Sequence, residues 1–145
     1  MVKLLDPVHA NNMYACLKDF GLNSASGIDF PGESNALIRD PGRWTSVDKA
    51  NISFGQGIAV NGTQLIMAFN ALINGGMLMK PYLVEHVADA SGKETQSFRP
   101  TIARKVISKD TSEEILGILT SVCSKGGTAE AAGISGYQVF GKTGT

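Results

Sequence analysis

The sequence predicts a mixed α+β fold built as one domain. Helix-like apolar stripes, a hairpin pattern and glycine-rich turns follow one another along the chain, and its 145 residues are the length of a single domain. A chain of this length can bury about two-thirds of its unfolded surface, so it can form a core of its own. We therefore expect no internal domain boundary within residues 1–145.

The first helix is predicted within residues 8–20. Apolar side chains recur there at the i, i+3, i+4, i+7 spacing of one helical face. They are Met13, Cys16, Leu17 and Phe20. Gly21 is expected to end this helix, because a residue without Cβ adopts a positive φ easily. Residues 24–34 (SASGIDFPGES) are rich in turn formers and predict a loop.

A second helix is expected around Leu65–Ile73, after a turn at residues 54–57. Its residues are apolar on almost every side, which is typical of a buried helix. Asn61 has the side chain of a good N-cap. Gly75-Gly76 is expected to end the helix.

A β-hairpin and a third helix are expected next. Two short β-compatible runs, residues 83–89 and 94–98, flank the turn-forming Ala90–Lys93. In the third helix Thr111 and Glu114 have the spacing of a capping box, followed by apolar residues at helical spacing up to Cys123. The last apolar run, residues 137–140, has strand composition.

Charge and composition exclude several functions. Thirteen basic and thirteen acidic residues cancel, so an electrostatic binder of nucleic acid or of an acidic membrane surface is not expected. Charged residues make up only 18% of the chain, against about 25% in average globular domains, which indicates surface that other protein covers. The cysteines and histidines lack metal-ligand spacing, and we expect no metal and no cofactor.

The last ten residues support two interpretations. Residues 136–143 (GYQVFGKT) fit the phosphate-loop pattern G-x-x-x-x-G-K-[ST], whose backbone N–H groups cradle phosphates at the start of a helix. The four residues between the glycines are bulky, however, and residues 128–135 do not form the hydrophobic strand that should come before the loop. Nucleotide binding is therefore the weaker alternative.

The other interpretation places Lys142, Thr143 and Gly144 on a strand, as the third motif of penicillin-binding proteins and serine β-lactamases. Further landmarks occur in the same order as in that family. They are residues 27–33 (GIDFPGE), residues 54–57 (FGQG) with Val60 and Gln64, Gly75-Gly76, Gly127-Thr128 and residues 136–145. Taken together, they resemble class B penicillin-binding proteins, the peptidoglycan D,D-transpeptidases, and are most similar to the septal, cell-division branch.

The resemblance implies part of a transpeptidase fold like that of penicillin-binding proteins and serine β-lactamases, with helices and short antiparallel strands, truncated at the Lys-Thr-Gly strand. It implies acyl transfer, in which a serine attacks the penultimate D-alanine carbonyl of a stem peptide. Lys142 would supply positive potential, while the hydroxyls of Thr143 and Thr145 would donate hydrogen bonds to the terminal carboxylate. Gly144 completes the motif, and the Thr145 backbone N–H would be an oxyanion donor.

The family's nucleophile motif, Ser-x-x-Lys, and its second motif, Ser-x-Asn, are expected outside this chain. Ser46-Val-Asp-Lys49 fits the first pattern, but it lies where the family has no catalytic group and follows residues that look like a loop. A serine activated by a lysine three residues later should begin a helix, so that both share one face. No Ser-x-Asn occurs in the sequence. We expect the C-terminal portion of a transpeptidase domain that is inactive alone.

The resemblance also implies partners and a location. The partners are the peptidoglycan stem peptide, β-lactams and the rest of the transpeptidase domain, with cell-division proteins as further candidates. The parent protein is expected in the bacterial inner membrane with its catalytic domain outside the cytoplasm, although this chain has no apolar stretch of 18 residues. A β-lactam-sensing or non-catalytic relative and a scaffold piece remain as alternatives.

Overall fold

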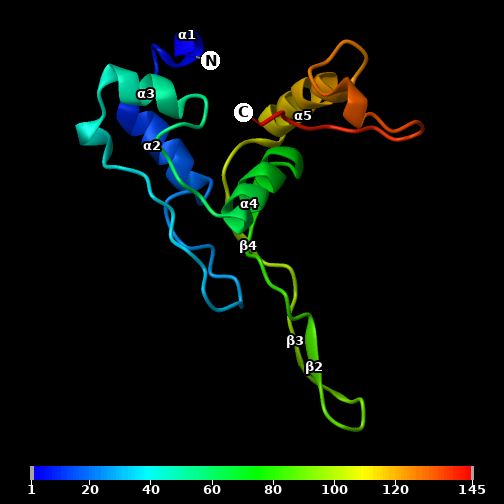
Figure 1. The fold of residues 1–145 in the computed structure, drawn as a ribbon. Helices are drawn as coiled ribbons and strands as arrows, with labels where there is room; N and C mark the ends of the chain where they lie inside the picture. Colours follow the sequence, from blue (N-terminus) through cyan, green and yellow to red (C-terminus); the bar gives the residue numbers. More distant parts are fainter. Residues whose placement is uncertain (1, 145) are drawn as a thin grey trace.

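The computed structural model describes residues 2–144 as two groups of helices, which the irregular residues 53–61 connect (Figure 1). The first group contains α1 (Val2–Leu5), α2 (Ala10–Asp19), the 3-10 turn η1 (Pro41–Arg43) and α3 (Ser46–Ile52). The second contains α4 (Gly62–Ile73), β1 (Met77–Met79), β4 (Ile102–Lys105), α5 (Lys109–Cys123) and the 3-10 turn η2 (Glu130–Ala132). Between β1 and β4, strands β2 (His86–Ala88) and β3 (Glu94–Ser97) form a hairpin that projects away from both groups. The predicted α+β class is confirmed.

Helix α2 is the centre of the first group. It contains Met13, Cys16 and Leu17 of the predicted stripe, with Phe20 as its C-cap, and Gly21 follows with a φ of +78°. Met13 is its buried side chain. The ring of Tyr14 meets that of Trp44 edge to face, with 6.2 Å between the centroids, and such a pair contributes about 0.5–1.5 kcal/mol beyond its buried area.

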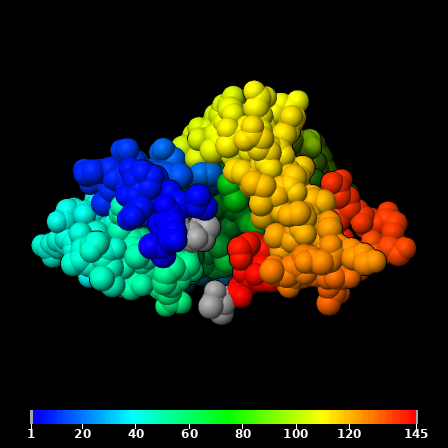
Figure 2. Space-filling model, turned by 90° about the horizontal axis from the view of Figure 1, so that it is seen from above, coloured from blue at the N-terminus to red at the C-terminus, as the bar shows by residue number. Residues whose placement is uncertain are grey.

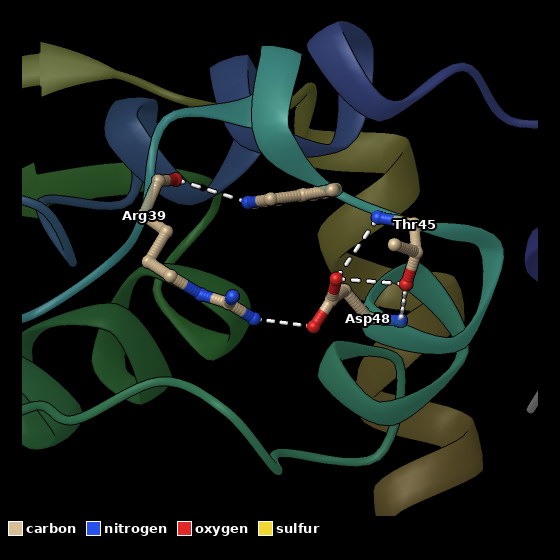
Figure 3. Close-up of polar contacts among 4 residues, drawn as sticks. Arg39, Thr45 and Asp48 are labelled. Atoms are coloured by element: carbon tan, nitrogen blue, oxygen red, sulfur yellow. Dashed lines mark hydrogen bonds and ion pairs between the residues drawn. The ribbon is translucent and has the colours of Figure 1, made fainter.

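Helix α3 is not predicted by the apolar pattern. It begins with a capping box, in which the Thr45 hydroxyl accepts from the Asp48 N–H (3.1 Å) and the Asp48 carboxylate accepts from the Thr45 N–H (2.9 Å). Asp48 also forms an ion pair with Arg39 (Figure 3). Hydrogen bonds from Thr45 and the Arg39 guanidinium lower the pKa of Asp48 to about 2. The Thr45-x-x-Asp48 spacing is the sequence signal for this helix start.

Helix α4 is the central element of the second group, and it contacts both β1 and α5. Asn61 is its N-cap, as expected, in a reciprocal box with Gln64. Its buried apolar face is narrow, because only Ala68 and Ala71 lie below a tenth exposure. The prediction of a helix buried on all sides is wrong for this structure: Leu65 is 58% and Ile66 70% exposed, since neither α5 nor β1 covers that face.

The turn between α4 and β1 is closely packed against the chain that leads into α5. Gly76 is buried and has a φ of +89°, and a Cβ built on it would lie 2.1 Å from the Ile107 carbonyl oxygen. Ser112 of α5 is 2% exposed; its hydroxyl donates to the Leu72 carbonyl (2.7 Å) and accepts from the Gly75 N–H (3.1 Å). Glycine at position 76 is therefore required for this contact.

The strands form two separate antiparallel pairs. β1 pairs with β4, and β2 pairs with β3, each with one register shift. The β2–β3 pair confirms the predicted hairpin. Its turn is closed by Asp89, whose carboxylate accepts from the N–H groups of Ser91 (2.9 Å) and Lys93 (3.1 Å). The short β1–β4 pair has no clear pattern in the sequence.

Two predictions near the C-terminal end are corrected by the structure. The N-cap of α5 is Ser108, which accepts from the Thr111 N–H (3.0 Å), so the predicted capping box of Thr111 with Glu114 is wrong. The serine one turn earlier caps the helix, and Thr111 lies inside it. Residues 137–140 do not form a strand, because no strand among residues 2–144 pairs with them.

The fold exposes more surface than a compact protein of its size. Its accessible area is 9831 Å², whereas a compact monomer of 15.3 kDa has roughly 7,000 Å². The exposed large apolar side chains include Leu65, Ile66, Ile118, Tyr137 and Phe140. This excess agrees with the low fraction of charged residues in the chain.

Candidate functional site

The predicted site residues lie together at the surface. Lys142, Thr143 and Gly144 are exposed and follow one another in an irregular segment that runs back along α5. Figure 2 shows this red segment at the surface, next to the orange residues around the end of α5 and the green residues of α4. Thr145, the expected oxyanion donor, lies outside the described residues.

The segment before Lys142 is held by α5. The Gly141 N–H donates to the Leu119 carbonyl (3.2 Å). Gly141 also lies over the buried thiol of Cys123, since a Cβ added at Gly141 would be 3.4 Å from the Cys123 Sγ. These contacts fix where Lys142 leaves the surface of α5, although the predicted strand is not formed.

Lys142–Gly144 form one side of a groove of about 880 Å³. The outward face of α4, with Leu65, Ile66 and Phe69, lines it from another side. Met79 at the end of β1, with Lys80 and Pro81 after it, completes the lining. The groove is thus mostly apolar, with the ammonium groups of Lys142 and Lys80 among its polar groups.

Lys142 has the geometry of an available cation. Its Nζ donates to the carbonyl oxygen (3.0 Å) and the hydroxyl (3.3 Å) of the adjacent Thr143. The ion pairs of residues 2–144 are Arg39–Asp48 and Lys109–Glu113, so Lys142 has no carboxylate partner within the described chain. An ammonium group has three donors and no acceptor; Lys142 can therefore bind an anionic group at the groove.

The loop of residues 24–34, here called the clasp loop, contacts α4. The Glu33 carboxylate accepts from the N–H groups of Ser26 (2.7 Å) and Gly27 (3.1 Å) and from the Asn61 side-chain amide (3.0 Å). Gln64, 1% exposed, donates from its side-chain amide to the Ser24 carbonyl. Residues 27–33 and Gln64 were landmarks of the resemblance, but their pairing across the chain has no local signal.

The clasp loop also contacts residues 83 and 84, which lie between β1 and β2. The Asp29 carboxylate accepts from the N–H groups of Leu83 (2.7 Å) and Val84 (3.0 Å). These hydrogen bonds lower the pKa of Asp29. One loop therefore contacts both the start of α4 and the root of the hairpin, two elements that are far apart in sequence.

The pKa of Glu33 leads to a testable pH dependence. Hydrogen bonds from the Ser26 hydroxyl and N–H, the Asn61 amide and the Gly27 N–H lower it from 4.5 to about 2. Because the folded pKa is depressed, the ionised carboxylate stabilises the fold above about pH 4.5, and this stability is lost as the pH falls toward about 2. We expect a smaller decrease for Glu33→Gln than for the unchanged protein, measured by urea unfolding at about pH 5 and about pH 3. Equal decreases contradict this assignment.

Ser46 lies apart from the groove. Ser46 is the first residue of α3. The expectation that Ser46 lies in a loop and does not begin a helix is therefore wrong, because the capping box of Thr45 and Asp48 starts a helix there. Lys49, however, donates from its Nζ to the carbonyls of Asp6 (2.8 Å) and Val8 (3.0 Å). Ser46 and Lys49 line a separate pocket with α1 and α2, and the structure does not bring Ser46 to Lys142.

The described residues form neither a phosphate loop nor a metal cluster. Residues 136–143 lead into no helix up to Gly144, so they lack the helix N-terminus that holds phosphates in a phosphate loop. Between Val2 and Gly144 the structure groups no three metal-ligating side chains of the His, Cys, Asp and Glu types. In the same range, no helix has the length and apolar character needed to cross a membrane.

The chain matches one family model along its whole length: residues 1–145 match the penicillin binding protein transpeptidase domain. It is 37% identical over 145 residues to stage V sporulation protein D of Bacillus subtilis, covering 99% of this chain and 22% of that relative. It is 32% identical over 138 residues to penicillin-binding protein PbpB of Mycobacterium tuberculosis, covering 91% and 20%. The chain thus spans about a fifth of the length of these relatives.

Solved structures agree with the fold. Penicillin binding protein 3 of Mycobacterium tuberculosis complexed with ampicillin superposes with a TM-score of 0.88 at 30% identity, covering 99% of this chain and 33% of that one. The apo transpeptidase domain of penicillin-binding protein 3 from Burkholderia pseudomallei gives a TM-score of 0.84 at 29% identity, covering 99% and 40%. The helices and short antiparallel strands are therefore those of these transpeptidase structures.

Proposed function

Because this chain belongs to the transpeptidase-domain family of class B penicillin-binding proteins, we propose that it forms the part of a peptidoglycan D,D-transpeptidase domain that presents Lys142–Gly144 to the substrate. The observation that carries the proposal is the exposed Lys142 at the edge of the groove, without a carboxylate partner in the described chain. The parent enzyme cross-links stem peptides by acyl transfer from a serine.

Lys142 and Thr143 bind the anionic end of the substrate. The Lys142 ammonium supplies positive potential, and the Thr143 hydroxyl donates a hydrogen bond to the terminal carboxylate of the stem peptide or to the matching carboxylate of a β-lactam. Thr145 contributes its hydroxyl to the same carboxylate and its backbone N–H to the oxyanion. Removing one oxyanion donor typically costs about 10²–10³ in rate.

The nucleophile comes from another part of the parent protein. Ser46 is exposed, but it does not line the groove that Lys142 lines. Ser46 and Lys49 line a different pocket, and the Lys49 ammonium is bound to two backbone carbonyls. The Ser-x-x-Lys helix and the Ser-x-Asn motif belong to the remainder of the transpeptidase domain. The matched structures support this division, because this chain covers only 33% and 40% of them.

The remainder of the domain covers the exposed apolar face of α4. The accessible area of 9831 Å² exceeds that of a compact monomer by roughly 2,800 Å², an amount in the range that permanent interfaces bury. Leu65 and Ile66 contribute to this surface. We place the parent protein in the bacterial inner membrane, with this domain facing the cell wall and cell-division proteins among its partners.

The chain by itself is expected to form no covalent adduct with a penicillin. It supplies the anion-binding segment without the nucleophile, and acylation requires a serine with an activating base. Intact-mass spectrometry after incubation with benzylpenicillin measures this directly, with the complete parent protein as the positive control. A stoichiometric adduct that disappears in Ser46→Ala would show that Ser46 is the nucleophile and would overturn the proposed division of the site.

A further inference from the structure

The clasp loop contacts both elements that line the groove together with Lys142. Glu33 contacts the first turn of α4, and α4 contributes Leu65 and Ile66 to the groove. Asp29 contacts the backbone two residues after Pro81, the last groove residue of the chain that follows β1. We propose that Glu33 and Asp29 are positioning residues, which hold α4 and residues 79–81 in place relative to Lys142–Gly144. This inference rests on the proposed function.

The contact at Glu33 leaves α4 little freedom at its start. The Asn61 side-chain amide donates to Glu33 (3.0 Å) and to the Ser34 carbonyl (2.8 Å), while its oxygen accepts from the Gln64 N–H (2.8 Å). The buried Gln64 returns a hydrogen bond to the Asn61 N–H (2.8 Å) and another to the clasp loop. The N-cap of α4 is therefore fixed to the loop from several directions.

The contact at Asp29 holds the chain that follows residues 79–81 in a similar way. Both carboxylate oxygens are used, one for the Leu83 N–H and one for the Val84 N–H. Those N–H groups belong to residues before β2, outside the pairing of the hairpin strands. Asp29 and Glu33 are four residues apart in one loop, so a shift of that loop moves both elements.

The chemistry of these contacts requires carboxylates. Ionised Glu33 is an acceptor only, and it faces donors only: two backbone N–H groups, the Ser26 hydroxyl and the Asn61 amide. In Glu33→Gln an NH₂ group of nearly the same size replaces one of the oxygens, so that a donor meets a donor and the loop must move. Glu33→Gln therefore tests the contact while it preserves the volume of the side chain.

The test uses the complete parent protein and a fluorescent penicillin. Two quantities are measured, the second-order rate constant of acylation and the fraction of protein that is finally acylated. For Glu33→Gln and for Asp29→Asn we expect the rate constant to fall about ten-fold or more, because misplacement by 1 Å can cost 10²-fold, while the acylated fraction stays complete. A residue needed only for folding would lower the acylated fraction instead.

Asp89→Asn is the matched control. Asp89 is also a carboxylate that accepts from backbone N–H groups in a turn, but it lies at the hairpin tip, away from the groove. Its rate constant should stay within about two-fold of the unchanged protein.

The outcomes separate this inference from the proposed function. If the unchanged parent protein is not acylated, the proposed function is overturned. If it is acylated, and Glu33→Gln has the same rate constant or only a reduced acylated fraction, the positioning role is overturned and the proposed function stands. An equal loss of rate in Asp89→Asn also overturns the positioning role.

Discussion

Lys142→Ala in the complete parent protein should slow acylation by a penicillin between about ten-fold and about hundred-fold. A hydrogen bond to a charged group contributes about 1.5–3 kcal/mol, and each 1.36 kcal/mol corresponds to about a factor of ten in rate. Lys142 is expected to have this effect because its ammonium is exposed at the groove and its partners in the described chain are both on Thr143. Stopped-flow acylation with a fluorescent penicillin measures the rate constant.

Lys125→Ala is the control for this experiment. Lys125 is an exposed lysine in the turn after α5 and does not line the groove. Removing the same charge there should change the rate constant by less than about two-fold. Equal losses for both lysines would mean that the overall positive charge matters, and the specific role of Lys142 would then be wrong.

Gly76→Ala is expected to have the largest effect on stability. The new Cβ would lie 2.1 Å from the Ile107 carbonyl oxygen and 2.8 Å from its carbon, which are backbone atoms that cannot rotate away. The φ of +89° adds the cost of a left-handed conformation, about 1–2 kcal/mol. With the strain of overpacking, about 1–3 kcal/mol, we expect the free energy of unfolding to fall by about 2–5 kcal/mol.

Gly92→Ala separates the two causes. Gly92 has a φ of +84° in the hairpin turn, but nothing lies within 4 Å of the position where its Cβ would be. Only the conformational cost applies there, so the expected loss is about 1–2 kcal/mol. Urea unfolding of both variants gives the two values. Similar losses would show that the chain at Ile107 moves aside without cost.

The parts of the fold that the sequence predicts are those with local causes. The stripe that ends at Phe20 predicts α2, the turn of residues 90–93 predicts the hairpin, and Asn61 predicts the cap of α4. The cap of α5 was misplaced by one turn because Ser108 and Thr111 both have capping side chains, and their competition depends on where the preceding chain arrives. The local sequence therefore limits the N-cap of α5 to Ser108 or Thr111 but does not decide between them.

The errors at the site have a different origin. A strand at residues 137–140 requires a neighbour, and the described chain supplies none, so strand composition alone does not decide the structure. The apolar composition of α4 predicts a buried helix, but Leu65 and Ile66 are exposed because neither β1 nor α5 covers that face. The contacts of Glu33 with Asn61 span 28 residues, a separation for which a single sequence carries no pattern.

The contact between Gly141 and Cys123 gives the site a built-in chemical reporter. The Cys123 thiol is 8% exposed, and the chain at Gly141 lies directly over it. Lys142 is the next residue, so Cys123 becomes more accessible to a thiol reagent when the chain that carries Lys142 lifts from α5. The Cys16→Ser substitution removes the exposed cysteine. In that variant the alkylation rate of Cys123 therefore reports local opening of the site.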